Sequence, residues 1–153
     1  MLTRQFNVVY VAADHAGFAY KNSVRDWLTK EGFKVCDMGA DVYDEQDDFP
    51  LVMTHAAHSV VTSSVPACAL LFGGSGQGEA MAANRIKGIR ATVFYGGDEQ
   101  IIELSRLHNN ANVLSLGARF VTLDDTKRLI WQWLHTVPGT DEKYTRRNRT
   151  LDI

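Results

Sequence analysis

The sequence predicts a three-layer α/β domain, in which a five-stranded, mostly parallel sheet is covered by helices on both faces. Short runs rich in β-branched and other apolar residues alternate along the chain with longer segments whose apolar residues recur at helical spacing. This alternation is typical of βαβ units. A chain of 153 residues, 45% hydrophobic and 22% charged, has the length and composition of one globular domain.

The strands are predicted where β-prone residues run together between turn signals. They are residues 8–12, 33–38, 67–72, 91–95 and 113–116. The third run, ACALLF, is apolar throughout and leads directly into a glycine-rich turn.

Local signals predict the helices between these strands. Apolar residues at Tyr20 and four, seven and eight positions later share one helical face, and Gly32 stands where a helix commonly ends. Pro50 suits the first turn of a helix that continues to about residue 64. After the fifth strand, Thr122 and Asp125 resemble a capping box at the start of another helix. Two further helices are predicted at residues 80–85 and 98–107.

Charge is distributed unevenly along the chain. The formal net charge of −2 argues against a general nucleic-acid binder. Basic residues crowd the end of the chain, after a break at Pro138 and Gly139. Acidic residues crowd one segment, at Asp41, Asp44, Glu45, Asp47 and Asp48. We interpret this segment as a solvated loop.

We expect neither a membrane anchor nor a secretion signal, because no apolar stretch approaches about 20 residues and the N-terminal residues lack an apolar core. We therefore expect a cytoplasmic protein without membrane contact. Cys36 and Cys68 lie in apolar strand-like runs and are interpreted as reduced core thiols. His55 and His58 lack an evident third ligand, so no metal is expected.

The most informative stretch is GGSGQGE at residues 73–79, directly after the third strand. Four glycines within six positions let successive backbone amides point into one concavity. The amides are those of Gly74, Ser75, Gly76, Gln77 and Gly78, and Glu79 stands at the lip. A cradle of donors beside a proton acceptor is the minimum equipment for forming an enolate-like intermediate.

The turns that follow the predicted strands gather on one edge of the sheet. They are residues 13–17, 73–79, 96–98 and 117–119, and they are rich in glycine and polar residues. Ligands of open α/β sheets bind beyond the carboxyl ends of the strands. The sequence therefore predicts a functional site at this edge.

Six segments, in order over nearly the whole chain, carry a resemblance to a known family. They are ADHAG at 13–17, DFP at 48–50, GGSGQGE at 73–79, AANR at 82–85, GIRA at 88–91 and RLHNNAN at 106–112. The chain thereby resembles the ribose-5-phosphate isomerase B family, which also includes galactose-6-phosphate and allose-6-phosphate isomerases. The resemblance implies a Rossmann-like domain that dimerises and completes each site with residues of both subunits. It implies aldose–ketose isomerisation of a sugar phosphate without metal or organic cofactor.

The family has two branches that differ in the catalytic base. One branch has cysteine at the position of Gly73, and the other has glycine there and a glutamate six residues later. This chain resembles the second branch, so Glu79 is the expected base, and burial must raise its pKa for that task. Cys68 lies inside the third strand, five residues before that position. The alternative interpretation of Glu79 is a first-turn glutamate that complements the helix dipole.

The resemblance implies that His108 is the ring-opening acid and that Asn109 binds sugar hydroxyls. It implies that Asp14 takes a hydroxyl proton during ring opening and that His15 contacts the substrate. Structural alternatives exist for both pairs. A His-Asn-Asn turn can end a helix with asparagine in the left-handed region, and an aspartate can cap the start of a helix.

The resemblance also implies that Arg119 and Arg147 bind the phosphate. In this chain Lys143 stands where the family has an arginine, and Tyr144 where it has a histidine. Lysine supplies charge but not the bidentate grip of a guanidinium. An exposed basic helix is the alternative interpretation of Lys143 and Arg147.

These observations predict an isomerase that interconverts ribose 5-phosphate and ribulose 5-phosphate, with the substrate as its only small-molecule partner. We expect one domain over residues 1–153, with the basic segment 140–153 at a subunit interface of a homodimer or tetramer. A six-carbon sugar phosphate is the alternative substrate, and a non-catalytic subunit of a hetero-oligomer remains open. A nucleotide-binding module is disfavoured because the turn lacks the third glycine of G-x-G-x-x-G and follows the third strand.

Overall fold

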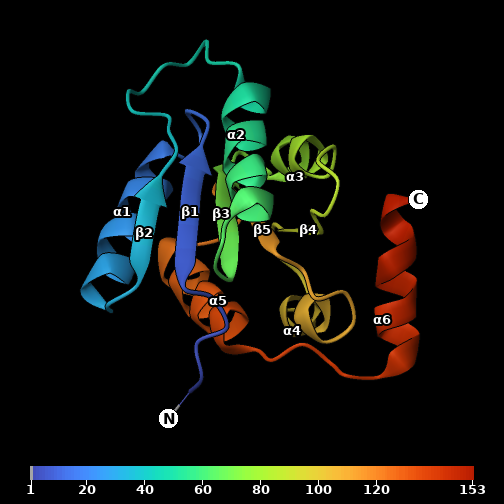
Figure 1. Ribbon diagram of the computed structural model, residues 1–153. Helices are drawn as coiled ribbons and strands as arrows, with labels where there is room; N and C mark the ends of the chain where they lie inside the picture. Colours follow the sequence, from blue (N-terminus) through green and yellow to red (C-terminus); the bar gives the residue numbers. More distant parts are fainter. Residues whose placement is uncertain (1) are drawn as a thin grey trace.

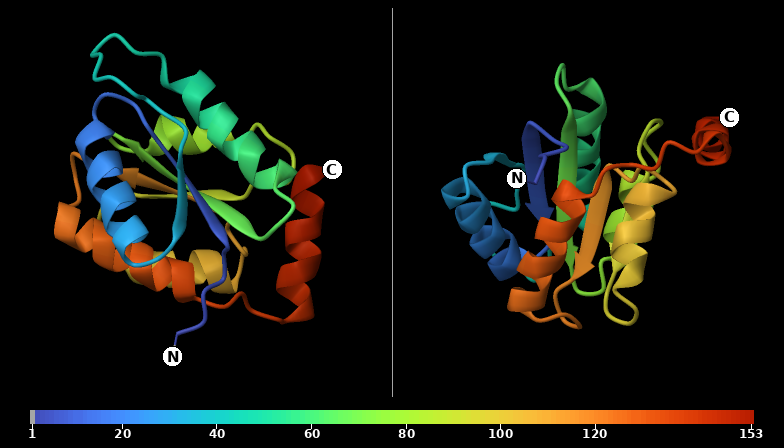
Figure 2. Two further views of the ribbon diagram at one scale, coloured as in Figure 1. Left: turned by 60° about the vertical axis from the view of Figure 1, so that its left-hand side comes forward. Right: turned by 90° about the horizontal axis from the view of Figure 1, so that it is seen from below.

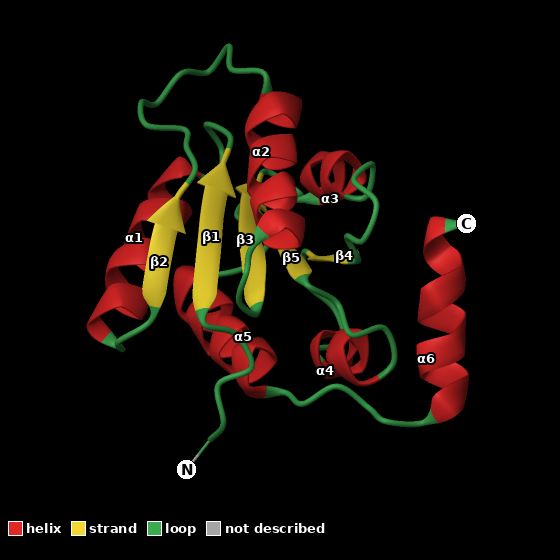
Figure 3. Cartoon of the chain, viewed as in Figure 1, coloured by secondary structure: helices red, strands yellow, loops and turns green. Residues whose placement is uncertain are grey.

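The computed structural model describes residues 2–153 as a five-stranded parallel sheet between two layers of helices (Figure 1). The strands are β1 (Val8–Ala13), β2 (Lys34–Asp37), β3 (Ala67–Gly73), β4 (Ala91–Phe94) and β5 (Val113–Gly117). Their order across the sheet is β2-β1-β3-β5-β4, and every neighbouring pair is parallel. The predicted Rossmann-like α/β class is confirmed, and Figure 3 shows the alternation of strands and helices along the chain.

The helices are α1 (Phe18–Lys30), α2 (Phe49–Thr62), α3 (Gln77–Ala83), α4 (Gln100–Leu107), α5 (Leu123–His135) and α6 (Glu142–Arg149), followed by the 3-10 turn η1 (Thr150–Asp152). Two of the predicted boundary signals act as expected. Gly32 follows α1 with φ +82°, a conformation that favours glycine. The Thr122 hydroxyl accepts a hydrogen bond of 3.2 Å from the Asp125 amide at the start of α5.

The sheet buries a hydrophobic core on each face, because successive residues of each strand point to opposite sides. Leu70 and Phe72 of β3 belong to the core formed with α1, α4 and α5, whereas Leu71 belongs to the core formed with α2 and α3. Cys68 is fully buried, as expected. Cys36 is only half-buried, because β2 is an edge strand, so its assignment to the core was wrong.

Helix α6 stands outside these layers, at the end of a segment that leaves α5 and passes beyond the sheet (Figures 1 and 2). None of its residues is buried. Among residues 2–153, no helix has the length and apolar character needed to cross a membrane.

Candidate active site

Glu79 lies in the first turn of α3 and is almost completely buried, with 4% of its surface exposed. Its carboxyl group rests directly against Gly73, the last residue of β3. A Cβ atom added at Gly73 would collide with the carboxyl carbon and with both carboxyl oxygens of Glu79. The glycine and the glutamate are therefore mutually dependent, since any side chain at position 73 would displace the carboxyl group.

The surroundings of Glu79 raise its pKa to about 7 from an ordinary value near 4.5. Burial is the largest cause, because it disfavours the charged carboxylate, and a hydrogen bond with the Asp14 side chain is the next. A carboxylate with a pKa close to neutral pH is well suited to take a proton and return it. An exposed glutamate that merely complements a helix dipole would not be held in this way.

Asp14 is placed beside Glu79 because β1 and β3 are neighbours in the sheet. It follows β1 directly, its amide donates to the Phe72 carbonyl at 3.1 Å, and its Oδ1 accepts from the Gly17 amide at 3.0 Å. A Cβ at Gly17 would collide with the Phe72 backbone, so only glycine lets this turn approach β3 so closely. The two acidic side chains are thus brought together by the first and third strands.

His15 is held by the acidic loop that follows β2. Its Nδ1 lies 2.8 Å from Oδ1 of Asp47, and this hydrogen bond is the main reason why the pKa of His15 is raised. The Tyr43 ring approaches the imidazole edge-on at 6.2 Å between centroids. The loop was expected to be solvated, and residues 41–46 are exposed, but Asp47 turns inward. Sequence reasoning missed this partner of His15, which lies 32 positions away.

The glycine-rich turn offers free backbone donors next to Glu79. Gly76 adopts φ +79°, and its carbonyl accepts a hydrogen bond of 2.6 Å from the Ser115 hydroxyl, which fixes the turn against β5. Within the described chain, the amides of Ser75, Gly76 and Gly78 donate to no protein acceptor. The Gln77 amide donates only weakly, at 3.3 Å, to the Ser75 hydroxyl. These amides can therefore hold developing negative charge on a ligand.

Arg119 joins the same group at the carboxyl end of β5. Its amide donates to the Gly74 carbonyl at 3.1 Å, and a Cβ added at Gly74 would lie 3.2 Å from its Nη1. The exposed guanidinium thus lies over the glycine turn, where it could bind a phosphate. One edge of the sheet brings together the predicted residues Asp14, His15, Gly74, Ser75, Gly76, Gln77, Gly78, Glu79 and Arg119.

The other predicted residues lie elsewhere in the same chain. His108 ends α4, which runs back from the carboxyl end of β4 toward the amino end of β5. Asn110 takes the left-handed conformation, with φ +43°, so the helix-ending turn anticipated as an alternative does exist. The backbone of this segment accepts hydrogen bonds from Arg90, which directly precedes β4. β5 advances by four residues from Val113 to Gly117. Its amino end, near His108, therefore lies about 13 Å from its carboxyl end, near Glu79.

The C-terminal segment 140–153, here called the tail, packs beside His108 and not beside Glu79. The Tyr144 ring stacks on the His108 imidazole, with 4.3 Å between centroids and 22° between planes. Lys143 and Arg147, on the same helix, are exposed. A groove of about 560 Å³ between α6 and the body is lined in part by His108, Lys87, Arg90 and Asn148. His108 and Asn109 therefore lie beside α6, the helix that carries Lys143 and Arg147, and we call these four residues the second cluster.

No group of three or more His, Cys, Asp or Glu side chains among residues 2–153 is arranged to hold a metal ion. The two clusters together offer carboxylates, imidazoles, backbone amides and cationic side chains. Fold and site define an α/β protein equipped for acid–base chemistry on a small anionic ligand.

Comparisons with known proteins identify the family. The chain matches the Ribose/Galactose Isomerase family over residues 9–151 and belongs to it. It is 35% identical over 129 residues to the probable ribose-5-phosphate isomerase B of Mycoplasma genitalium, covering 84% of this chain and 83% of that one. It is 37% identical over 128 residues to D-erythrulose-4-phosphate isomerase 2 of Mycolicibacterium smegmatis, covering 82% of each.

The similarity extends to three-dimensional structure. The crystal structure of the Mycoplasma genitalium ribose-5-phosphate isomerase B with bound ribulose-5-phosphate matches with a TM-score of 0.88 and 31% identity. The match covers 97% of this chain and 95% of that one. The resemblance stated from the six sequence segments is thus confirmed at the level of the family.

Proposed function

We propose that this protein interconverts ribose 5-phosphate and ribulose 5-phosphate through an enediolate, without a cofactor. The observation that carries the proposal is the environment of Glu79. Its carboxyl group is buried against Gly73, its pKa is raised to about 7, and it adjoins amides that have no partner among the described residues. This arrangement joins a proton acceptor to a site for negative charge, as proton transfer between neighbouring sugar carbons requires.

The proposed reaction has two stages. Ribose 5-phosphate enters as a furanose, and His108 protonates the ring oxygen while Asp14 takes the hydroxyl proton at C1, which opens the ring. Glu79 then removes the proton at C2 and returns it to C1, and a proton passes from the C2 hydroxyl to the C1 oxygen, while the amides of the glycine turn hold the enediolate oxygens. His15 and Asn109 bind hydroxyl groups, and Arg119, Lys143 and Arg147 bind the phosphate.

We propose further that each site is shared between two copies of the chain. Within one chain, His108 lies toward the amino end of β5 and Glu79 toward its carboxyl end, and these two ends are about 13 Å apart along the strand. This placement argues against both residues of one chain acting on the same sugar. A homodimer in which segment 140–153 packs at the interface would bring the His108 cluster of one copy to the Glu79 cluster of the other. Pairing of dimers into a tetramer is compatible with this arrangement.

A mixing experiment tests the shared site. Glu79→Gln and His108→Ala homodimers should each be inactive in the conversion of ribose 5-phosphate, and mixed dimers formed by refolding them together should regain that activity. Each mixed dimer contains one site with both residues intact and one with neither. If both residues came from one chain, no mixed dimer would hold an intact site, and activity would stay absent.

The proposed ring-opening groups distinguish a five-carbon substrate from a four-carbon one. One relative is a D-erythrulose-4-phosphate isomerase, which makes a four-carbon phosphate the second candidate substrate. An aldotetrose 4-phosphate cannot close a furanose ring, because the oxygen that would close it carries the phosphate. A ring-opening acid at His108 and its partner at Asp14 therefore favour a five-carbon over a four-carbon substrate. A six-carbon phosphate would use the same groups.

The decisive experiment is deuterium incorporation from D2O, followed by NMR, on four-, five- and six-carbon aldose and ketose phosphates. The C1 and C2 protons of the true substrate pair should exchange, with the highest kcat/KM for the five-carbon pair. Absence of exchange with every substrate would refute an isomerase function. We propose the cytoplasm as the location, where Cys36 and Cys68 remain free thiols.

A further inference from the structure

The tail touches the body at the segment that carries His108. The Gly139 amide donates a hydrogen bond of 3.0 Å to the Leu107 carbonyl. Tyr144 stacks on the His108 ring, and the Asn148 side chain donates to the His108 carbonyl at 3.0 Å. A side chain at Gly139 would collide with the Leu107 carbonyl, so glycine lets the tail pass this close to the end of α4. The contacts converge on two successive residues.

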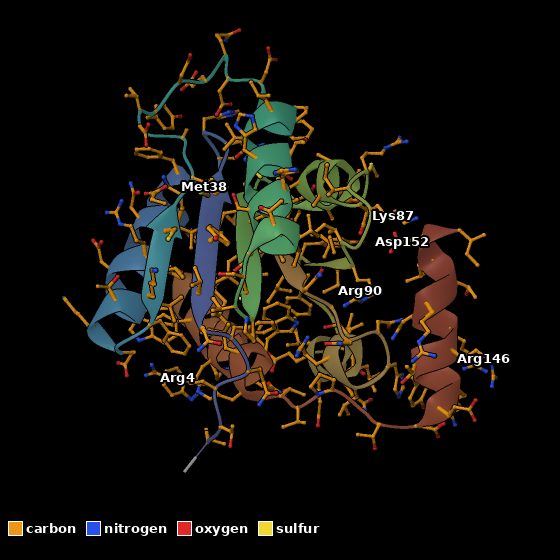
Figure 4. All side chains as sticks on the ribbon, viewed as in Figure 1. Arg4, Met38, Lys87, Arg90, Arg146 and Asp152 are labelled. Carbon is orange, nitrogen blue, oxygen red and sulfur yellow. The ribbon has the colours of Figure 1, made fainter. Side chains whose placement is uncertain are left out.

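The exposed fractions of the side chains along α6 show that Tyr144 and Asn148 form the face of the helix that is turned toward the body. Tyr144 and Asn148 are half-buried, whereas all the other residues of the helix are exposed. They are four positions apart and therefore lie on the same face. Figure 4 shows Arg146 pointing away from the body, on the opposite side of α6. Among the described residues, the helix thus makes its side-chain contact with the body largely through the pair that holds His108.

We propose that Tyr144, supported by Asn148, is a positioning residue for His108. An imidazole at the exposed end of a helix can rotate about its side-chain bonds, which lowers the fraction of time in a productive orientation. A stacked aromatic ring restricts that rotation, and the bond from Asn148 fixes the backbone from which the imidazole extends. The inference rests on the proposed function, because it assigns Tyr144 to the ring-opening stage of that reaction.

Two reactions of the same protein separate ring opening from proton transfer. Conversion of ribose 5-phosphate requires both stages. Exchange of the C1 proton of ribulose 5-phosphate with D2O requires only proton transfer, because this ketose is open-chain: its C5 oxygen carries the phosphate. A residue that positions the ring-opening acid should affect the first reaction and spare the second.

The test compares Tyr144→Ala, Tyr144→Phe and Arg146→Ala at saturating substrate. Tyr144→Ala should lower kcat for ribose 5-phosphate by about 10- to 100-fold, which is the range expected from misplacing a general acid. Its rate of exchange on ribulose 5-phosphate should stay within about twofold of wild type, since that step involves no general acid at His108. Tyr144→Phe, which keeps the ring, and Arg146→Ala, which keeps the stack, should behave as wild type in both reactions.

A spectroscopic signature reports the stack directly. The aromatic ring of Tyr144 should shift the carbon-bound imidazole protons of His108 upfield in the NMR spectrum, and Tyr144→Ala should remove that shift while Tyr144→Phe keeps it. If Tyr144→Ala fails to fold, Asn148→Ala, which leaves the stacked ring in place, should give the same selective loss to a smaller degree.

Three outcomes would overturn the proposal: no loss in either reaction, an equal loss in both, or failure of Tyr144→Phe to restore the rate. An equal loss would mean that Tyr144 merely supports the fold. Failure of the proposed function has a different signature, since Glu79→Gln would then leave the exchange on ribulose 5-phosphate intact.

Discussion

The two clusters of candidate residues differ in how they are built. Glu79 and Asp14 are buried where three central strands end, and glycines at positions 17, 73 and 76 allow the backbone to close around them. His108 is half-buried at the end of α4 and is covered by a helix that has no buried residue. The buried cluster can shift a pKa far from its ordinary value, whereas the outer cluster presents groups that can reach another molecule.

The difference in burial between the two clusters follows from the chemistry proposed for each of them. Removing a proton from carbon needs a carboxylate that is a stronger base than one in water, and burial is the largest source of that change at Glu79. Phosphate binding uses the positive charge of arginine and lysine, and protonation of a ring oxygen uses a proton donor such as histidine. A helix on the surface is sufficient for those tasks, provided that something orients the imidazole.

Loss of the Glu79 carboxylate should have the largest effect on activity. Glu79→Gln keeps the shape of the side chain but cannot accept the C2 proton, so isomerisation and deuterium exchange should fall by at least about 1,000-fold. Binding of ribulose 5-phosphate, measured by calorimetry, should change little. Activity close to wild type would remove Glu79 from the role of base and with it the contrast between the clusters.

Filling the space at Gly73 should have the next largest effect. Gly73→Ala and Gly73→Cys both place a Cβ where the Glu79 carboxyl group lies. We expect activity to fall by about 100-fold, because the base is displaced by an ångström or more. The free energy of unfolding, measured in urea, should fall by about 1–3 kcal/mol from overpacking. Adding Glu79→Ala to Gly73→Cys should restore the stability by removing the collision; no restoration would show that the clash lies elsewhere.

The raised pKa of Glu79 predicts a specific dependence of stability on pH. Between about pH 4.5 and about 7, the native protein keeps a proton on Glu79 that the unfolded chain has lost. The contribution of Glu79 to the free energy of unfolding is therefore fully present below pH 4.5 and is lost as the pH rises toward 7. Urea unfolding measures this contribution. From pH 5 to pH 8, the free energy of unfolding of wild type should fall by on the order of 1 kcal/mol more than that of Glu79→Gln.

An exposed glutamate provides the control for this pH effect. Glu103→Gln in α4 removes the same charge from a solvated position, and its stability should run parallel to that of wild type. If the free energy of unfolding of Glu79→Gln also changes with pH as that of wild type does, the pKa of Glu79 is not raised by burial. Activity should rise with pH through the same interval, because the base must be deprotonated to act.

Much of the buried cluster could be predicted from the sequence, because its signals are local. The glycines of residues 73–78 lie within a few positions of Glu79, and the turn that follows β1 is adjacent to Asp14. In a parallel sheet, the order of β4, α4 and β5 along the chain places His108, at the end of α4, near the amino end of β5. The separation of the two clusters thus follows from the topology, although the strand order β3-β5-β4 had to come from the structure.

Contacts between distant segments could not be predicted in this way. Asp47 reaches His15 across 32 positions, and Tyr144 reaches His108 across the whole of β5 and α5. Neither pair has a periodic pattern or a spacing that marks it. The half-buried state of Cys36 has the same origin, because an apolar run does not reveal which strand lies at the edge of the sheet.

The smallest predicted effect tests whether the acidic loop belongs to the buried cluster. Asp47→Asn removes the carboxylate that raises the pKa of His15, so the imidazole should lose its proton at a lower pH in an NMR titration. We expect KM for the sugar phosphate to rise by a few fold, with little change in kcat, because the proposed role of His15 is to bind the substrate and not to move its protons. Asp41→Asn removes the same charge from an exposed position of the same loop and should leave KM unchanged. Equal changes in the two variants would mean that the loop acts through its overall negative charge. A change confined to Asp47→Asn would make this loop, 32 positions from His15, part of the surroundings of the Glu79 cluster.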